Sequence, residues 1–306
     1  MTGWSAKDIP DQTGRRAIVT GANSGLGFHT ALELARHGAS VVMTARDKSK
    51  GDEAVRRVRA EVPDASVELG QLDLADLASV REFATADGDE PLDILVNNAG
   101  VMAIPRRETV DGFEMQIGTN HLGPFALTGL LMSALLRAPA ARAVTVSSFM
   151  HWFGALDLGD LMGERRYQEW TAYGQSKLAN LLFMRGLDKR AHGTGLISAA
   201  AHPGLSSTNL QKVGPQMRGS HGGGLLPAVT RVVGQSAAMG ALPQLHAATA
   251  PGVRGGDYFG PRGPAQQRGR PKRVRMSKNA RSDEAADALW ERSEQLTGVT
   301  YDALPA

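Results

Sequence analysis

The sequence predicts an α/β fold in which helices cover both faces of a doubly wound parallel sheet. Between residues 14 and 204, short apolar runs alternate with longer segments whose apolar residues recur at helical spacing. Runs that are apolar throughout and end in turn residues are typical of strands buried on both faces. Their alternation with helices favours βαβ units with right-handed crossovers. We therefore expect one domain with a parallel sheet of about seven strands.

The first hundred residues contain four expected strands, at Arg16–Thr20, Ser40–Thr44, Val67–Leu72 and Leu92–Val96. The helices between them are expected at Phe28–His37, from Asp47 to Val62 and from Asp76 to Ala86. The two aspartates can cap these helices, because a carboxylate accepts hydrogen bonds from the unpaired N–H groups of the first turn. Gly38 follows the first helix as a stop signal.

The second half continues the alternation up to Gly204. It contains an expected helix at Pro124–Leu136, a strand at Ala143–Ser147, a helix that opens at Tyr173 and runs to Arg190, and a strand at Leu196–Ala201. Gly- and Pro-rich sequence follows, and periodicity returns only in a helix from Asp283 to Leu296 that Gly298 closes. No internal repeat or clear linker divides the chain.

Composition excludes several kinds of site. The 306 residues include no cysteine, so disulfides, thiolate nucleophiles and cysteine-ligated metal centres are excluded. His151 and His202 have no partner at metal-ligand spacing, and no metal site is expected. The first twelve residues are polar, and no apolar run is long enough to span a bilayer. We expect a soluble, cytoplasmic protein without a membrane span.

Positive charge is concentrated near the end of the chain, although the net charge is only +3. From Arg262 to Arg281 there are eight Lys or Arg residues and no acidic residue. One interpretation is a patch for nucleic acid, acidic lipid or a phosphorylated ligand. Because no aromatic residue is interleaved and no nucleic-acid motif accompanies the stretch, the sequence favours a solvated loop before the last helix.

A glycine-rich turn, Thr20-Gly21-Ala22-Asn23-Ser24-Gly25-Leu26-Gly27, joins the first strand to the first helix. In a doubly wound sheet this turn lies at the carboxyl edge, where ligands bind. Glycines permit a tight turn and close approach to a pyrophosphate, and the helix N-terminus offers unpaired N–H groups. The spacing is neither GxGxxG nor a Walker pattern. A connector without a ligand is the alternative, but the position of the turn favours phosphate binding.

Tyr173 and Lys177 lie four residues apart on an expected helix, so their side chains can reach one site. A free phenol has a pKa near 10, and a nearby ammonium favours the phenolate. Lowering that pKa to about 7 takes about 4 kcal/mol, which requires a second positive charge, such as an oxidised nicotinamide, or a strongly polarised site. Alone, the pair is more typical of an ordinary helix with an exposed Lys and a half-buried Tyr.

The glycine turn and the Tyr173–Lys177 pair belong to a larger ordered set of motifs. The others are Asn97-Asn98-Ala99-Gly100 after the fourth strand, Asn120 in Thr119-Asn120-His121-Leu122-Gly123, Ser148 after the fifth strand, and Pro203-Gly204 with Thr208 after the sixth. Over roughly residues 14 to 210 this set resembles the short-chain dehydrogenase/reductase family. The chain looks most like its retinol-dehydrogenase and WW-domain-oxidoreductase branch, as a soluble bacterial-type member. The long spacing between Ser148 and Tyr173 suits that branch.

The resemblance implies a Rossmann-type domain over residues 1–306, with a cofactor-binding and catalytic core at 14–204, a substrate lid and basic loop at 205–282, and a C-terminal helix and tail at 283–306. It implies hydride transfer between a nicotinamide and a carbonyl or alcohol carbon. Tyr173 would act as general acid or base, and Lys177 would lower its pKa and hold the nicotinamide ribose. Ser148, preferred over the more buried Ser147, would bind the substrate oxygen, and Asn120 would help to hold a proton-relaying water. The implied cofactor contacts are Gly21, Asn23, Ser24, Gly25, Leu26, Gly27, Arg46, Asp73, Leu74, Asn98, Ala99, Gly100, Tyr173, Lys177, Pro203, Gly204 and Thr208.

The choice of cofactor is predicted from the segment after the second strand. Ala45 stands where an acidic residue would bind the ribose hydroxyl of NAD, and Arg46 follows it. A guanidinium can pair with a phosphate. NADP(H) is therefore predicted over NAD(H), unless Arg46 merely covers the adenine.

The substrate side is the least determined part. Met150, His151, Trp152, Phe153 and Trp170, with the loop Leu205–Leu226, suggest a pocket for a hydrophobic ketone, aldehyde or alcohol, although these residues could equally be packing. Alternatives are an NAD(H)-dependent tailoring or steroid-type dehydrogenase and a non-catalytic dinucleotide-sensing or scaffold protein. No GxSxG elbow supports hydrolase chemistry. No nucleic-acid partner is expected, and the family suggests a homodimer or homotetramer.

Overall fold

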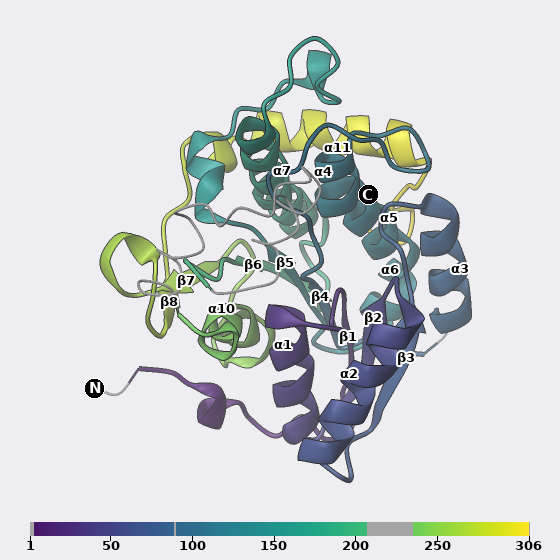
Figure 1. Ribbon diagram of the computed structural model, residues 1–306, viewed down its shortest axis with the longest axis vertical. Helices are drawn as coiled ribbons and strands as arrows, with labels where there is room; N and C mark the ends of the chain where they lie inside the picture. Colours follow the sequence, from purple (N-terminus) through teal and green to yellow (C-terminus); the bar gives the residue numbers. More distant parts are fainter. Residues whose placement is uncertain (1–2, 89, 207–234, 306) are drawn as a thin grey trace.

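Eight strands form one sheet in the computed structural model, in the order β3-β2-β1-β4-β5-β6-β7-β8 (Figure 1). The structure describes residues 3–88, 90–206 and 235–305. The strands are β1 (Arg16–Val19), β2 (Ser40–Ala45), β3 (Val67–Gln71), β4 (Ile94–Asn97), β5 (Arg142–Val146), β6 (Ile197–Ala201), β7 (Tyr258–Pro261) and β8 (Pro271–Arg273). The first seven are parallel, and β8 pairs antiparallel with β7. The predicted doubly wound parallel sheet is confirmed, with one antiparallel strand added at its edge.

Helices cover both faces of this sheet. One face carries α1 (Gly25–Arg36), α2 (Lys48–Glu61) and α10 (Ala237–Thr249), and the other carries α3 (Leu77–Asp87), α5 (Gly123–Leu130), α6 (Met132–Arg137) and α7 (Glu169–Arg190), with α11 (Asp283–Thr297) packed outside α7. Each face of the sheet has its own hydrophobic core, and successive strand residues alternate between the two. In β2, Val41 and Met43 point to the core under α1, α2 and α10, and Val42 points to the core on the opposite face. Short turns of helix complete the chain: η1 (Ala6–Asp8), α4 (Met115–Ile117), η2 (Gly118–Leu122), η3 (Phe149–Phe153), η4 (Leu158–Asp160), η5 (Pro264–Gln266) and η6 (Asn279–Arg281).

The predicted caps form as local chemistry requires. The Asp47 carboxylate accepts a hydrogen bond from the N–H of Lys50 at the start of α2, and Asp76 accepts two from the first turn of α3. Gly298 closes α11 with a φ of 62°, in the left-handed region that favours glycine. All six predicted strands lie within two residues of their expected bounds.

Three helical segments differ from the predictions. The single helix expected at Pro124–Leu136 is divided at Leu131, whose ψ of 4° ends α5 before α6 begins. The helix expected to open at Tyr173 begins at Glu169, because Gln168 acts as its cap and accepts a hydrogen bond from the N–H of Thr171. α10 was not expected, since its internal Pro243 is normally a helix breaker.

The range 205–282, expected as a lid and basic loop, contains α10, β7 and β8 within the described residues. Most of Leu205–Leu226, the expected substrate lid, lies outside the described residues. Within the described ranges, no helix combines the length and the apolar character needed to cross a bilayer.

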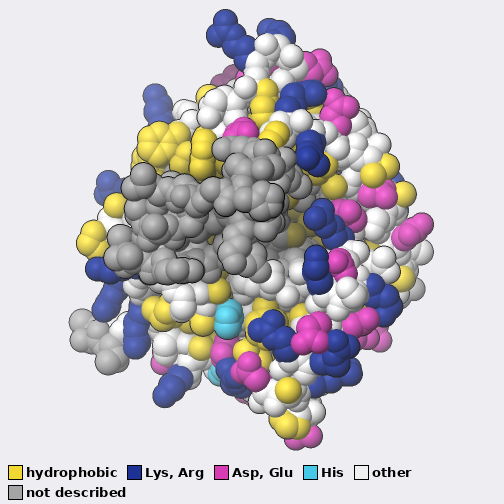
Figure 2. All heavy atoms as spheres, in the orientation of Figure 1, with side chains coloured by type: hydrophobic (Ala, Val, Ile, Leu, Met, Phe, Trp, Pro, Cys, Tyr) yellow, Lys and Arg dark blue, Asp and Glu magenta, His cyan; other side chains and the backbone are white. Residues whose placement is uncertain are grey.

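Two surface cations on α2 are paired within the helix. Lys48 pairs with Asp52 at 2.8 Å and Arg56 pairs with Glu53 at 2.5 Å. Figure 2 shows acidic and basic side chains mixed over this lower part of the molecule.

An aromatic cluster fastens the end of the chain to the sheet layer. The Trp290 ring of α11 lies 5.1 Å from Phe125, 5.9 Å from Phe183 and 4.4 Å from Tyr301, measured between ring centroids. Arg190 covers the indole at 4.3 Å. The Tyr301 hydroxyl donates to the carbonyl of Phe125 at 2.7 Å. Trp290, which is 4% exposed, is therefore the main anchor of α11.

We expect Trp290→Ala to lower the free energy of unfolding by about 3–5 kcal/mol, because it leaves a cavity among these rings. Urea unfolding followed by circular dichroism measures the loss. Trp152→Ala is the matched control, since Trp152 is 42% exposed and its removal should cost less than about 1 kcal/mol. Equal losses in the two variants would contradict this role of Trp290.

Candidate cofactor and catalytic site

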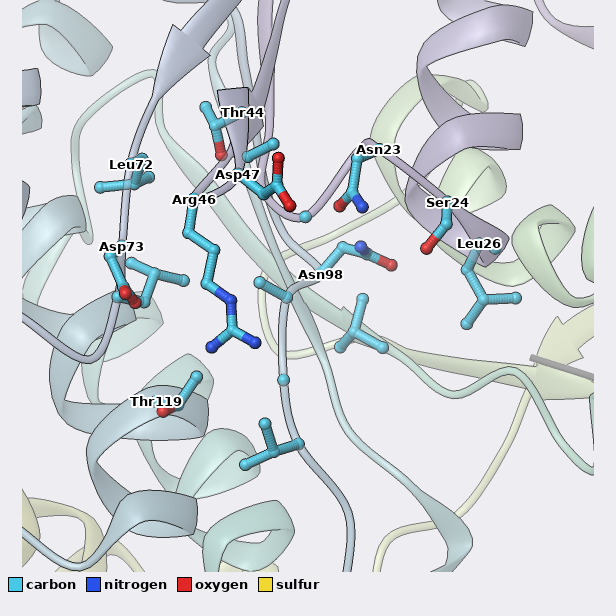
Figure 3. Close-up of a pocket in the computed structure, with 18 of the residues that line it drawn as sticks. Asn23, Ser24, Leu26, Thr44, Arg46, Asp47, Leu72, Asp73, Asn98 and Thr119 are labelled. Atoms are coloured by element: carbon cyan, nitrogen blue, oxygen red, sulfur yellow. The ribbon is translucent and has the colours of Figure 1, made fainter. Parts of the chain in front are cut away.

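A pocket opens at the carboxyl edge of the sheet, where the order of strands reverses between β1 and β4 (Figure 3). Fourteen of the predicted residues line it: Gly21, Asn23, Ser24, Gly25, Leu26, Arg46, Asp73, Leu74, Asn98, Ala99, Gly100, Tyr173, Lys177 and Pro203. Of the other predicted residues, Gly27 lies beneath the turn, Gly204 follows Pro203, and Thr208 lies outside the described residues. Asn120 and Ser148 do not line the pocket themselves, but Asn120 hydrogen-bonds the lining residue Val101 and Ser148 hydrogen-bonds the lining residue Tyr173. The structure thus brings together motifs that are far apart in the sequence.

The pocket also has lining residues that the motifs did not indicate. They are Thr44, Asp47, Lys50, Leu72, Val101, Thr119, Val146 and Ser147, with Ala45 at the strand end. Most are direct sequence neighbours of a predicted residue, so their position at a strand end could have identified them as lining residues. Lys50 is not such a neighbour: it lies in the first turn of α2, four residues after Arg46.

The glycine turn is shaped by contacts that exclude side chains. Gly21 and Gly25 have φ values of 64° and 57°, which favour glycine. A Cβ on Gly27 would overlap the carbonyl oxygen of Gly21 and the Asn98 side chain. Ser24 caps α1 without a side-chain hydrogen bond, so the first N–H groups of this helix remain available to an anion.

Asn98 and Thr20 brace this turn from the neighbouring strand. The Asn98 Nδ2 donates to the Thr20 carbonyl at 2.7 Å, and the N–H groups of Asn98 and Ala99 donate to Thr20 Oγ1 at 2.9 and 3.0 Å. Gln244 of α10 donates to Asn98 Oδ1 at 3.2 Å. The turn is therefore held rigidly before any ligand binds.

A positively charged corner forms beside the turn. Figure 3 shows the Arg46 side chain extending into the pocket, between Asp73 on one side and Asn98 on the other. Lys50 lines the same corner. Two acids, Asp47 and Asp73, line the pocket as well. Asp47 pairs with Lys50 at 3.2 Å and accepts hydrogen bonds from Ser49 and the N–H of Lys50, which lower the pKa of its carboxyl to about 2. Arg46 has no ion-pair partner within the described residues, so its guanidinium is available to an anionic group.

Tyr173, Ser148 and Lys177 meet at the far end of the pocket. Tyr173 is buried, and burial raises the pKa of its phenol to about 12, partly offset by a hydrogen bond with Ser148. Lys177 Nζ lies 5.7 Å from the centre of the Tyr173 ring. The expected lowering of the phenol pKa by this ammonium is outweighed by burial in the protein alone.

Lys177 is itself a buried cation, 4% exposed. Its Nζ donates to the carbonyl of Val146 at 3.1 Å, and burial lowers its pKa to about 8. An ammonium carries three donors. Because Lys177 lines the pocket, its remaining donors can serve a ligand there.

The two neighbouring serines differ in their contacts. Ser147 is 2% exposed, and its hydroxyl donates to the carbonyl of Lys177 at 2.7 Å. Ser148 is only half-buried and shares the hydrogen bond with Tyr173. The position of Ser148 is fixed by His151, whose Nδ1 donates to its carbonyl at 2.7 Å.

Asn120 lies in the π-helical turn η2 and is used for bracing. Its Oδ1 accepts from the N–H of Val101 at 2.7 Å, and its Nδ2 donates to the carbonyl of Val101 and to Ser176 Oγ, both at 2.9 Å. A Cβ on Gly100 would contact both Asn120 Oδ1 and Lys177 Nζ. The amide thus ties the segment after β4 to α7, next to Lys177.

The aromatic residues expected near the substrate separate into two groups. The Trp170 ring lies 6.3 Å from the Tyr173 ring, at the reactive end of the pocket. Trp152 and Phe153, by contrast, are 42% and 68% exposed. Within the described residues, Trp170 therefore makes a ring contact with a predicted catalytic residue, whereas His151 contacts Ser148 through its hydrogen bond.

Comparisons with known proteins agree over nearly the whole chain. The sequence model of the short chain dehydrogenase family matches residues 15–218. Retinol dehydrogenase 12 of Mus musculus is 40% identical, over 94% of this chain and 88% of the mouse protein. A solved uncharacterized protein from Mycobacterium Paratuberculosis is 45% identical with a TM-score of 0.81, covering 98% of this chain and 99% of that one. A dehydrogenase from Beutenbergia cavernae, solved with NADP at low occupancy, is 26% identical with a TM-score of 0.60, covering 79% and 93%.

The buried Lys177 has a consequence for stability. Its pKa is lowered from 10.5 to about 8. Below pH 8 the lysine is charged in both states, and the buried charge destabilises the folded protein relative to the unfolded chain. We expect Lys177→Met to stabilise the protein at pH 7 by on the order of 3 kcal/mol. Val146 keeps a hydrogen bond from Asn180, so its carbonyl is not left unpaired.

The gain in free energy of unfolding from Lys177→Met should decrease as the pH rises from 8 to 10.5. In this range the wild-type lysine is already neutral in the folded protein but still charged in the unfolded chain. Urea unfolding at pH 7 and pH 9.5 measures both values. A variant that is less stable than the wild type at pH 7 would contradict the burial of an uncompensated charge.

Proposed function

The chain belongs to the short-chain dehydrogenase family, and we propose that within it the protein transfers hydride between NADP(H) and a hydrophobic ketone, aldehyde or alcohol. Its family and its retinol dehydrogenase relatives make it an oxidoreductase that acts on CH–OH or C=O groups. The single observation that carries the finer proposal is the meeting of Tyr173, Ser148 and Lys177 at the end of a pocket built for a dinucleotide.

The roles proposed for Tyr173, Ser148 and Lys177 follow from their protonation states and from the hydrogen-bond donors that they have available. Tyr173 is protonated at neutral pH, as a general acid for carbonyl reduction must be. Ser148 shares its hydrogen bond and would place the substrate oxygen against the phenol. Lys177 would donate to the nicotinamide ribose and, as an ammonium, favour the phenolate form of Tyr173 once the proton has left.

Several features of the pocket fit a dinucleotide. The pyrophosphate would lie on the N–H groups at the start of α1, where the absence of a Cβ on Gly27 allows the turn to close. Asp73 and Leu74 would contact the adenine. When bound, the cofactor supplies or accepts the hydride.

Preference for NADP(H) is supported by charge. Arg46 and Lys50 line one corner, and Arg46 has no ion-pair partner within the described parts of the chain. Asp47 is turned toward the start of α2, so its carboxylate is already occupied by hydrogen bonds. A 2′-phosphate would pair with Arg46, and with Lys50 in exchange for its 3.2 Å ion pair with Asp47. The Beutenbergia cavernae relative with NADP bound is consistent with this choice.

A hydrophobic substrate is supported more indirectly. Trp170 presents an aromatic surface beside Tyr173. The relatives with about 40% identity are named for retinol and polyprenol, which are apolar alcohols. A bulky apolar group beside the reacting carbon would gain from burial against such a surface.

We expect Tyr173→Phe to lower the rate of carbonyl reduction by 10²- to 10⁴-fold, the usual contribution of a positioned acid. Steady-state assays on a panel of apolar aldehydes and ketones measure the rate, and nicotinamide fluorescence measures cofactor binding. Cofactor binding should stay within about threefold of the wild type, because the hydroxyl that is removed hydrogen-bonds Ser148 and would serve the substrate oxygen. Full activity in the variant would refute the assignment of Tyr173.

We expect Arg46→Glu to raise the Michaelis constant for NADPH by about 10- to 100-fold and to leave that for NADH nearly unchanged, since a charged hydrogen bond to the 2′-phosphate is lost. Arg56→Glu is the matched control, because Arg56 is exposed on α2 and paired with Glu53. An equal effect of Arg46→Glu on both cofactors would overturn the NADP(H) preference.

A further inference from the structure

Two exposed aromatic side chains stand next to the proposed catalytic serine. Trp152 and Phe153 are 42% and 68% exposed, on the short helix η3 that Ser148 caps. Within the described ranges, Val110 is the one other large apolar side chain of comparable exposure, and it lies elsewhere, bonded through its N–H to Ala75. Two adjacent exposed aromatic side chains form a small apolar patch, and exposed apolar patches often mark an interaction surface.

The helix that carries Trp152 and Phe153 packs against the basic stretch Arg262–Arg281, although the two are far apart in the sequence. The N–H of Ser277 donates to His151 Nε2 at 3.2 Å, and Asn279 Nδ2 donates to the carbonyl of Gly154 at 3.5 Å. η3 is thereby fastened along residues 277–279. The exposed side chains of Arg275, Lys278 and Arg281 lie on this same segment. The stretch thus has the aromatic neighbours that the sequence alone did not reveal.

The positive charge of this surface is not neutralised by the protein. Of the eight Lys and Arg residues between Arg262 and Arg281, only Arg273 forms an ion pair within the described residues, with Asp257 at 2.5 Å. On α2, by contrast, Lys48 and Arg56 are paired within the helix. Figure 2 shows hydrophobic side chains at the upper left of the molecule with Lys or Arg side chains above and below them.

We propose that Trp152, Phe153 and the basic residues 275–281 form a docking surface for an anionic lipid membrane. Trp and Phe partition into the membrane–water interface, where their rings lie at the level of the head groups. Lys and Arg beside them are attracted to the negative surface of anionic lipids. The structure presents both kinds of side chain together, which is the combination that interfacial binding requires.

Other partners fit this surface less well. Single-stranded nucleic acid is bound by a positively charged groove in which successive bases stack on aromatic rings, whereas here the two aromatic residues stand on one short exposed helix. A second copy of the chain would repel through the same unpaired cations. Two aromatic side chains also cover far less than the ~800 Å² per partner that a stable dimer buries.

Vesicle sedimentation tests the proposal with the full chain. Vesicles of phosphatidylcholine alone are compared with vesicles that also contain phosphatidylserine, at low and high salt. We expect binding to the anionic vesicles only, weakening as salt rises. The double variants Trp152→Ser/Phe153→Ser and Arg275→Glu/Lys278→Glu should each weaken binding more than tenfold, since each charge near the surface contributes about fivefold.

Matched controls change the same residue types elsewhere. Val110→Ser removes an exposed apolar side chain, and Lys48→Glu/Arg56→Glu reverses two surface cations. Both should bind anionic vesicles within about twofold of the wild type. Nicotinamide fluorescence checks that every variant is folded, and it keeps a failure of the cofactor assignment distinct from a failure of lipid binding.

Three results would overturn the proposal. The wild type could fail to sediment with anionic vesicles, or the controls could lose as much binding as the surface variants. Alternatively, Trp152→Ser/Phe153→Ser could abolish RNA binding or self-association, measured by ultracentrifugation, without changing vesicle binding. The last result would assign the surface to a nucleic acid or to a second copy of the chain.

Discussion

The close approach between the ends of β1 and β4 is the constraint on which the site depends. Thr20 accepts two backbone hydrogen bonds from the segment after β4, and Asn98 returns one to the Thr20 carbonyl. Only a glycine at position 27 leaves room for the Asn98 side chain between the two segments. α10 supports the same point, because Gln244 bonds both Asn98 and Thr30. The unpaired N–H groups of α1 are consequently aimed before a ligand arrives, which reduces the ordering cost of binding.

At the reactive end of the pocket, burial disfavours the charged forms of both ionisable groups, Tyr173 and Lys177. Burial raises the pKa of Tyr173 to about 12 and lowers that of Lys177 to about 8. An empty site therefore disfavours both the phenolate and the ammonium. A positively charged nicotinamide would shift the balance for the phenol, whereas the ribose hydroxyls would satisfy the ammonium. A site of this kind sacrifices stability for function, and the surrounding cores of the sheet must offset the cost.

Much of this arrangement could be predicted from the sequence because it depends on local spacing. The glycine turn must follow the first strand, and residues 173 and 177 share a helix face wherever that helix begins. α10 could not be predicted, because Pro243 breaks the helical pattern and packing against α1 and the sheet compensates for the lost hydrogen bond. The side-chain partners of Asn120, which are Val101 and Ser176, could not be predicted either, because spacing alone does not give such contacts.

The exposure of Trp152 could not be predicted from the sequence either, because it depends on which distant segment packs against η3. His151 is the link: its Nδ1 donates to the carbonyl of Ser148, and its Nε2 accepts from the N–H of Ser277. Both bonds require a neutral imidazole, and burial lowers the pKa of His151 accordingly. One histidine therefore positions the proposed catalytic serine and holds the basic segment against the same short helix.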